Sequence, residues 1–116
     1  MSFNFENLSV YQKAINLADE IYLLTKLWPK EYLYDLTSQL RRSVLSIALN
    51  IAEGQSRSKR DNRRFLDISR GSCFEAAAII DLALKQKLLS QPNYDKIYSQ
   101  LTEISRMITG LKSSLK

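Results

Sequence analysis

Hydrophobic residues recur every three or four positions along most of this sequence, which is the spacing of amphipathic helices. The clearest run leads up to Gly54, and its apolar positions are Leu36, Leu40, Val44, Ile47 and Ile51. This run predicts a helix from about Asp35 to Glu53, with Asp35 or Thr37 as its N-cap. We expect Gly54 to end the helix in a left-handed conformation, which glycine adopts without a steric penalty.

The same spacing, together with the positions of proline and glycine, predicts three further helices. One runs from about Ser9 to Trp28 and stops before Pro29, one runs from about Asp61 to Leu89, and the last starts near Asn93. The third helix in the chain is expected to carry inward Phe65, Ser69, Ser72, Ala76, Ile80, Ala83 and Leu88. The last helix spaces its apolar residues by alternating fours and threes, at Ile97, Leu101, Ile104, Ile108, Leu111 and Leu115. Such spacing is typical of helices that pack at a shallow angle.

Short connections between these helices favour antiparallel neighbours. The sequence therefore predicts an all-α protein, with a single domain over residues 1–116 that forms an up-down-up-down antiparallel four-helix bundle.

The helices also carry more apolar surface than one bundle needs. Leu45, Leu49 and Ala52 lie almost opposite the main apolar stripe of the second helix, and Leu23 and Leu27 lie outside the stripe of the first. A helix that is apolar on two sides must bury both of them. Either the second helix packs between two others of the same bundle, or copies of the chain associate. We favour self-association, because soluble chains commonly form symmetric oligomers.

Composition narrows the classes of function. The chain has 116 residues, 17 basic and 12 acidic, with a formal charge of +5 and no histidine. The absence of histidine removes the commonest general base and the usual partner of a catalytic nucleophile. The three glycines lie far apart, so no phosphate-binding loop is present. We expect no catalytic residues, no metal site and no cofactor.

The single cysteine, Cys73, excludes an internal disulfide and favours a reducing compartment. We expect a cytoplasmic protein, because the sequence shows no signal peptide and no apolar run long enough to cross a membrane. Small residues surround Cys73, and we expect its side chain to be buried and structural rather than reactive. Asn50 and Glu75 are expected to be partners in an interhelical hydrogen bond, with an active-site role as the less favoured alternative.

A dense group of basic residues follows the second helix, with Asp61 as the only acid inside it. Its members are Arg57, Lys59, Arg60, Arg63 and Arg64, and the set of eight is completed by Arg41, Arg42 and Arg70. We expect all eight at one end or side of the bundle. Seven are arginines, which grip phosphates with two hydrogen bonds, so the set predicts salt-sensitive nucleic-acid binding without sequence specificity. The alternative is a solvated surface partly neutralised by nearby acids. Aromatic residues are not interleaved with these cations, so base-specific recognition is not supported.

Several motifs in order along the chain resemble those of one bacterial family. They are Phe5-Glu6-Asn7-Leu8, Tyr11-Gln12-Lys13-Ala14, Gln39-Leu40-Arg41-Arg42, Ser46-Ile47, Asn50-Ile51-Ala52-Glu53-Gly54, Arg64-Phe65-Leu66 and Gly71-Ser72-Cys73-Phe74-Glu75. The chain resembles the four-helix-bundle proteins encoded in intervening sequences of large-subunit ribosomal RNA genes. It is also similar to the accessory variability protein of diversity-generating retroelements, a basic pentamer that binds nucleic acid and a reverse transcriptase.

The resemblance implies a closed four-helix bundle that assembles as a homopentameric ring, with no established catalytic activity. The basic positions that match are Arg41, Arg42 and the group from Arg57 to Arg64. The matching polar positions, for which we expect structural roles, are Asn50, Glu53 and Glu75. Two positions depart from the pattern. Ala48 stands where relatives often carry proline, so a kink should be weaker, and Cys73 replaces a larger aliphatic residue, which favours packing over chemistry.

Two functions of different classes remain open. The leading hypothesis is a non-enzymatic, self-assembling accessory factor that binds RNA or DNA through its arginine-rich corner, with a reverse transcriptase or another protein as a further partner. The alternative is an interaction scaffold that binds an acidic protein partner without nucleic acid.

Overall fold

The computed structural model describes residues 3–115, in which all regular structure is helical. The long helices are α1 (Ser9–Thr25), α2 (Ser38–Gly54), α3 (Lys59–Lys85) and α4 (Gln91–Ser113). Short helical turns are η1 (Asn4–Asn7) before α1, and η2 (Lys30–Tyr32) and η3 (Leu33–Thr37) between α1 and α2. The all-α class is therefore confirmed for the part of the chain that the structure describes.

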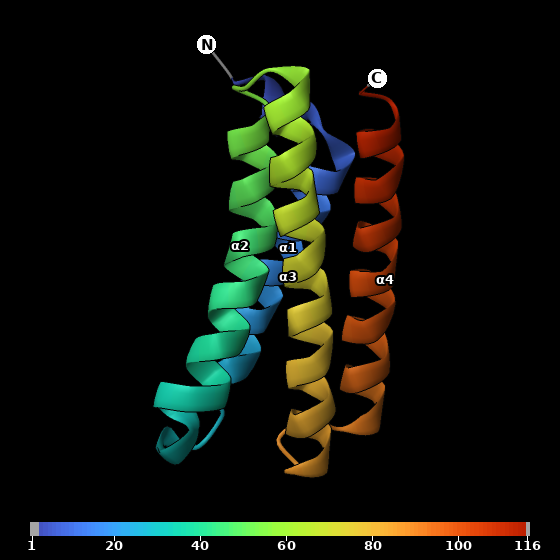
Figure 1. Cartoon of the computed structure of the whole chain (residues 1–116). Coiled ribbons are helices and arrows are strands. Elements are labelled where there is room, and N and C mark those ends of the chain that lie inside the picture. The colour runs from blue at the N-terminus through green and yellow to red at the C-terminus, as the bar shows by residue number, and fades with distance from the viewer. Residues whose placement is uncertain (1–2, 116) are drawn as a thin grey trace.

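The four long helices lie side by side and are consistent with a four-helix bundle (Figure 1). In Figure 1 the chain runs downward in α1 and α3 and upward in α2 and α4. α2 and α3 make the most extensive contact, and α1 packs against α2 and, more sparsely, against α4. The molecule is elongated, at 43 × 26 × 20 Å.

The hydrophobic core occupies the space between the four helices, and the helical spacing of the sequence located most of it. Leu40, Val44, Ile47 and Ile51 of α2 are fully buried, and so are Ile104 and Ile108 of α4. α3 contributes mainly Leu66, Ser69, Cys73, Ala76, Ile80 and Ala83. Phe65 was predicted to point inward but is only half-buried, because its neighbour Leu66 takes the core position.

The predicted start of the second helix is wrong by a few residues. The chain first forms η3, a single π-helical turn, and α2 begins at Ser38. Neither expected N-cap caps it: the Thr37 side chain makes no capping hydrogen bond, and the Asp35 carboxylate accepts a hydrogen bond from the Leu36 backbone. Because η3 already precedes α2, the first backbone N–H groups of α2 do not need a side-chain cap.

The prediction of a left-handed cap at Gly54 is also wrong. No glycine among residues 3–115 has a positive φ, and Gly54 is the last residue of α2. Gly54 is buried, and a Cβ added to it would meet the Asn62 side-chain oxygen and lie 3.2 Å from Phe65 Cβ. Glycine is therefore needed here because α3 passes close by, and not because of its backbone freedom.

Lys87, just after α3, is the only residue other than glycine with a left-handed backbone among residues 3–115. Lys87 has a φ of 61°, and the backbone N–H groups of Lys87 and Leu88 donate to the carbonyls of Leu84 and Ala83. This pattern is a Schellman motif, in which glycine usually occupies the left-handed position. Because lysine stands there instead, the sequence spacing overestimated α3, which was expected to continue to Leu89.

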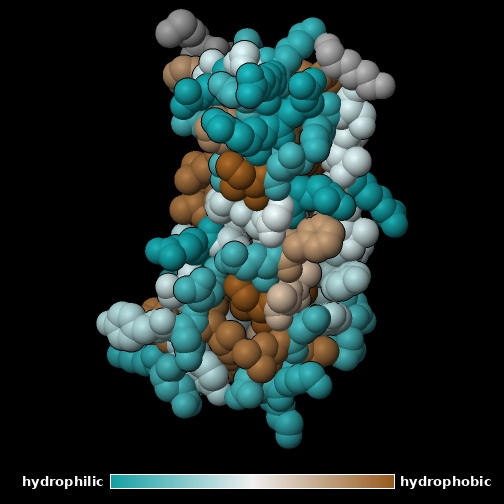
Figure 2. All heavy atoms as spheres, in the orientation of Figure 1, coloured by the Kyte–Doolittle hydropathy of each residue, from teal (hydrophilic) through white to brown (hydrophobic). Residues whose placement is uncertain are grey.

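The extra apolar positions of α1 and α2 lie on the surface, as the helical spacing predicted. Leu23 on α1 and Leu27, in the turn after α1, are 57% and 83% exposed, and Leu45 and Leu49 on α2 are 37% and 54% exposed. Figure 2 shows apolar side chains between polar ones on the face formed by α2 and α3. α2 packs against both α1 and α3 of its own chain, and yet Leu45 and Leu49 of its second apolar face stay exposed.

Candidate nucleic-acid interface

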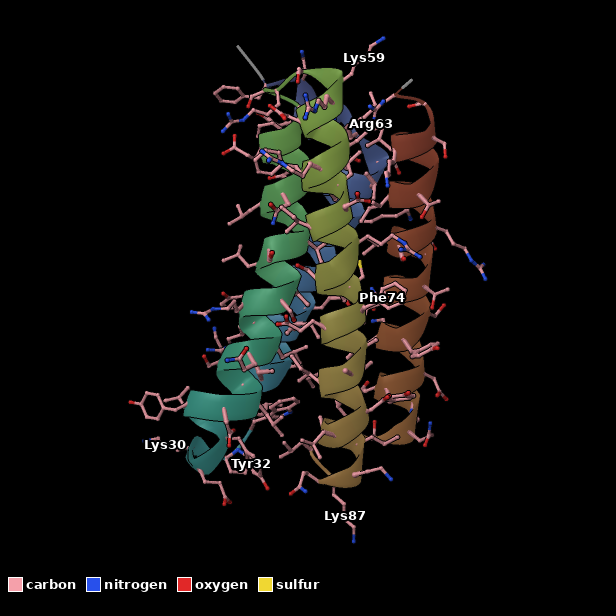
Figure 3. The ribbon with its side chains drawn as sticks, viewed as in Figure 1. Lys30, Tyr32, Lys59, Arg63, Phe74 and Lys87 are labelled. Atoms are coloured by element: carbon pink, nitrogen blue, oxygen red, sulfur yellow. The ribbon has the colours of Figure 1, made fainter. Side chains whose placement is uncertain are left out.

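Five of the eight predicted basic residues gather where α2 passes into α3. We name Arg57, Lys59, Arg60, Arg63 and Arg64 the arginine cluster. The chain turns after Gly54, and Ser58 caps α3 by accepting a hydrogen bond from the Asp61 backbone at 3.2 Å. Figure 3 shows Lys59 and Arg63 at this end of the bundle.

The first turn of α3 is an electrostatically unfavourable place for the cations that the sequence puts there. The N-terminus of a helix carries the equivalent of about half a positive charge, and cations in the first turn are unfavourable there by roughly 0.3–1 kcal/mol each. Lys59 and Arg60 are the first two residues of α3, and only Asp61 in that turn is acidic. A bound anion would be attracted by the side chains and by the helix terminus together.

The cluster is only weakly neutralised. Arg57 lies 3.5 Å from Glu53 and Arg64 lies 3.9 Å from Asp61, and all four side chains are substantially exposed. Ion pairs of this kind contribute little, because water screens them. Lys59 and Arg60 are exposed and form no ion pair with any residue in the range 3–115.

Arg63 plays a different part from its neighbours. It is half-buried and donates a hydrogen bond to the backbone carbonyl of Leu115, just beyond the end of α4. This contact fastens the start of α3 to the residues that follow the end of α4. Arg63 therefore helps to position the cluster.

Aromatic rings lie beside several of the arginines, and the sequence analysis did not predict these contacts. The Arg57 and Arg64 guanidinium groups lie 5.4 and 5.9 Å from the centroid of the Phe65 ring. The Arg70 guanidinium lies 4.9 Å from the centroid of Phe74. The i, i+4 spacing of Arg70 and Phe74 and the adjacency of Arg64 and Phe65 were the available signals.

Arg41 and Arg42 do not join the cluster. They lie near the start of α2, and the twelve residues from Arg42 to Gly54 correspond to about 18 Å along the helix. Arg41 is half-buried, donates a hydrogen bond of 2.8 Å to the Thr25 hydroxyl, and lies 5.0 Å from the centroid of Tyr22. Arg41 thus joins α1 to α2, and Arg42 is an exposed arginine far from the cluster. Arg70 lies on α3, roughly 10 Å along the helix from Arg63.

The polar residues near the core form structural links. Asn50 donates to Ser46 on its own helix, Ser72 of α3 donates to the Ser46 hydroxyl at 2.9 Å, and the buried Ser69 hydroxyl donates to the Ile47 carbonyl at 2.7 Å. The expected pairing of Asn50 with Glu75 is not formed. The interhelical links come instead from the two serines of α3.

Cys73 is buried, and its burial raises the pKa of the thiol to about 12. A thiol that stays protonated is a poor nucleophile, which fits the structural role expected for it. Among residues 3–115, no group of three or more cysteine, aspartate or glutamate side chains could hold a metal ion. Within the same range, no helix is long and apolar enough to cross a membrane.

The fold and the basic cluster define a small all-α protein with a cationic end. The family model of the 23S rRNA-intervening sequence protein matches residues 6–110. The chain therefore belongs to this family, and the resemblance drawn from its motifs is confirmed.

A solved structure has the same fold. It is a protein of unknown function from the S23 ribosomal protein family of Bacteroides thetaiotaomicron, with a TM-score of 0.81 and 24% sequence identity. The alignment covers 89% of this chain and 97% of the other. No curated protein matches the sequence.

Proposed function

We propose that this protein is a non-enzymatic, self-assembling four-helix bundle that binds RNA through the arginine cluster and acts as an accessory factor. The observation that carries the proposal is the group of exposed cations at the N-terminus of α3. Lys59 and Arg60 lie where the helix dipole disfavours them and have no acidic partner in the described chain. Such an arrangement reduces the stability of the free protein and attracts phosphate.

RNA is favoured as the nucleic acid because the family is that of the 23S rRNA-intervening sequence protein. Arginine-dominated contacts to phosphates would bind it without reading its sequence.

The proposed unit is an up-down-up-down bundle that associates into a homopentamer. The alternating helix directions in Figure 1 support the topology, and the exposed leucines of α1 and α2 supply apolar surface for association. The number five comes from the family resemblance, and mass measurement in solution at micromolar concentration tests it. A single subunit under those conditions would refute the assembly.

A titration of labelled RNA by fluorescence anisotropy at several salt concentrations tests the binding. We expect affinity to fall linearly on a logarithmic scale with salt, and Arg60→Gln and Arg64→Gln each to reduce that slope by about one. The matched control is Arg42→Gln, which removes the same charge from an exposed arginine at the other end of α2. We expect this control to bind RNA almost as wild type does.

The same variants separate function from stability. Arg60→Gln should raise the free energy of unfolding by about 0.3–1 kcal/mol, because it removes a cation from the first turn of α3. Loss of binding together with a gain in stability excludes misfolding as the cause. The proposal fails if wild type does not bind RNA at low salt, if salt has no effect, or if Arg42→Gln weakens binding as much as Arg60→Gln does.

A further inference from the structure

A second surface lies in the groove between α3 and α4. The groove has a volume of about 310 Å³ and is lined by Cys73, Phe74, Ala77, Tyr98, Leu101, Thr102, Ser105 and Arg106. Small side chains from α3 form part of its lining, and the aromatic rings come one from each helix. Figure 3 shows Phe74 on the side of α3 that faces α4.

The groove is bounded along α3 by two polar links to α4. On one side the Lys112 ammonium lies 2.6 Å from the Asp67 carboxylate, and on the other the Tyr94 hydroxyl donates a 2.6 Å hydrogen bond to Asp81. Asp67 and Asp81 each lie seven residues, or about two helical turns, from Phe74. The buried core residues of α3 and α4 hold the two helices together, so the groove between them is already formed in one chain, and the exposed Lys112–Asp67 pair adds little.

Both aromatic rings of the groove are exposed and held in place. Phe74 is 59% exposed and Tyr98 is 50% exposed, although both are large side chains with an apolar ring. The Tyr98 ring stacks on Tyr94 at a centroid distance of 5.8 Å, and Tyr94 is anchored by Asp81. Rings that are held in this way can stack against a planar group with little loss of conformational entropy.

The charge around the groove is positive. Arg106 is part of the lining, and Arg70 lies beside Phe74, while no carboxylate lines the groove. Of the neighbouring acids, Asp67 pairs with Lys112 and Glu103 pairs with Lys13, while Asp81 accepts a hydrogen bond from Tyr94 and keeps its negative charge. The groove therefore offers aromatic rings together with Arg70 and Arg106, two guanidinium groups that form no ion pair within residues 3–115, and this combination suits a planar base attached to a phosphate.

The groove lies along α3 from the arginine cluster, with the Lys112–Asp67 pair between them. Arg63, Arg70 and Phe74 are spaced by seven and four residues, which places them along one side of α3. A polyanion bound at the cluster would meet Arg70 next and the groove after that.

We infer that the Phe74–Tyr98 groove binds unpaired bases, and that the nucleic acid of this protein is single-stranded along this stretch. The inference rests on the proposed RNA binding and adds to it the class of RNA. In a duplex the faces of the bases are covered by their neighbours, so a duplex could contact only the arginines. An unpaired strand could place its phosphates on Arg70 and Arg106 and its bases on the two rings.

Three RNA probes of equal length and label test the inference: a short oligouridylate, the same backbone without bases, and a duplex. We expect wild type to bind oligouridylate more tightly than the abasic strand, although both carry the same charge per strand. Replacing Phe74 and Tyr98 by leucine should weaken oligouridylate binding by about 5- to 100-fold per ring, because stacking is lost. Binding of the abasic strand and of the duplex should change little.

Two further variants complete the design. Phe74→Trp keeps a stacking ring and should restore oligouridylate affinity, and quenching of the new tryptophan on binding would report direct contact. Arg60→Gln should weaken the binding of all three probes by a similar factor, because each probe carries phosphates that can contact the cluster. These results together place the bases in the groove and the phosphates on the arginines.

The outcomes that overturn the inference differ from those that overturn RNA binding. If wild type binds oligouridylate and the abasic strand equally, or if the leucine variants bind oligouridylate as wild type does, the groove does not hold bases and the cluster alone accounts for binding. If the leucine variants change the mass of the particle in solution, the groove is instead a contact between copies of the chain. If no probe binds, the proposed function itself fails.

Discussion

A methyl group added at Gly54 tests how closely α2 and α3 approach beside the arginine cluster. Gly54 is buried, and a Cβ there would collide with the side-chain oxygen of Asn62 and lie 3.2 Å from Phe65 Cβ. The Asn62 oxygen is itself buried without a hydrogen-bond partner in the described chain, and little free space surrounds it. Phe65 Cβ is fixed to the backbone of α3 and cannot move without the helix.

Two terms of opposite sign decide the size of the effect of Gly54→Ala. Alanine is a better helix former than glycine by about 0.8–1 kcal/mol. Overpacking a tight contact costs roughly 1–3 kcal/mol, because side chains leave their preferred rotamers and the backbone shifts. We expect the second term to win, so Gly54→Ala should lower the free energy of unfolding by about 1 kcal/mol.

The other two glycines of the chain are matched controls. Gly71 in α3 and Gly110 in α4 are helical, and apart from the local backbone and the adjacent residues no atom lies within 4 Å of the position that a Cβ would take. Gly71→Ala and Gly110→Ala should therefore stabilise the protein by up to about 1 kcal/mol each. Urea unfolding at a fixed protein concentration would measure all three variants, because association makes apparent stability depend on concentration.

The expected result is a difference of roughly 2 kcal/mol in unfolding free energy between Gly54→Ala and the two controls. If Gly54→Ala stabilises the protein as much as Gly71→Ala does, the close approach of α2 and α3 is wrong. Because Phe65 lies under the guanidinium groups of Arg57 and Arg64, Gly54→Ala should also weaken RNA binding while the controls do not.

Three smaller tests examine other contacts. Lys87→Gly should raise the midpoint of thermal unfolding, because a left-handed conformation costs a lysine about 1–2 kcal/mol that glycine avoids; an unchanged or lower midpoint would contradict the Schellman turn. Ser69→Ala should cost about 0.5–1.5 kcal/mol in urea unfolding, because it removes the buried hydrogen bond to Ile47, and a neutral result would show that this bond adds nothing. The thiol of Cys73 has a pKa near 9 in the unfolded chain and about 12 in the folded one, so it ionises first in the unfolded chain as the pH rises. Between these two values the wild type should therefore lose stability relative to Cys73→Ala. Parallel pH profiles of the two proteins would argue against the buried thiol.

The sequence located the helices well and their ends less well, for a physical reason. Apolar residues that recur every 3.6 positions identify the inward face of a helix, and this face correctly includes Leu40 and Ile104. The period depends only on which side of the helix is buried. Helix ends depend on local hydrogen bonding and on neighbouring helices. Gly54 looked like a left-handed cap but is required by the passage of α3, whereas the left-handed position after α3 is occupied by Lys87.

The candidate site, too, could be predicted from the sequence only in part. The arginine cluster could be predicted, because its members are adjacent in sequence and a short turn keeps them together. The sequence analysis grouped Arg41 and Arg42 with the cluster, although the twelve helical residues from Arg42 to Gly54 already separate them from it by about 18 Å. The α3–α4 groove gave no sequence signal, since Phe74 and Tyr98 meet only through the packing of two helices.

The arrangement of apolar and charged surface also explains how a modest charge could hold a polyanion. The exposed leucines lie along α1 and α2, whereas the arginine cluster lies at the end of the bundle where α2 meets α3. Association through the sides of the helices would leave this end uncovered.

In a closed cyclic assembly every subunit is related to the next by the same rotation, so all copies of the cluster lie at one height along the axis and at one distance from it. Clusters that lie farther apart than about one Debye length, roughly 8 Å at physiological salt, are screened from one another and act as separate contacts. Repeated in this way, the clusters would offer a single RNA strand one cationic contact on each subunit, so that the strand could bind several subunits at once.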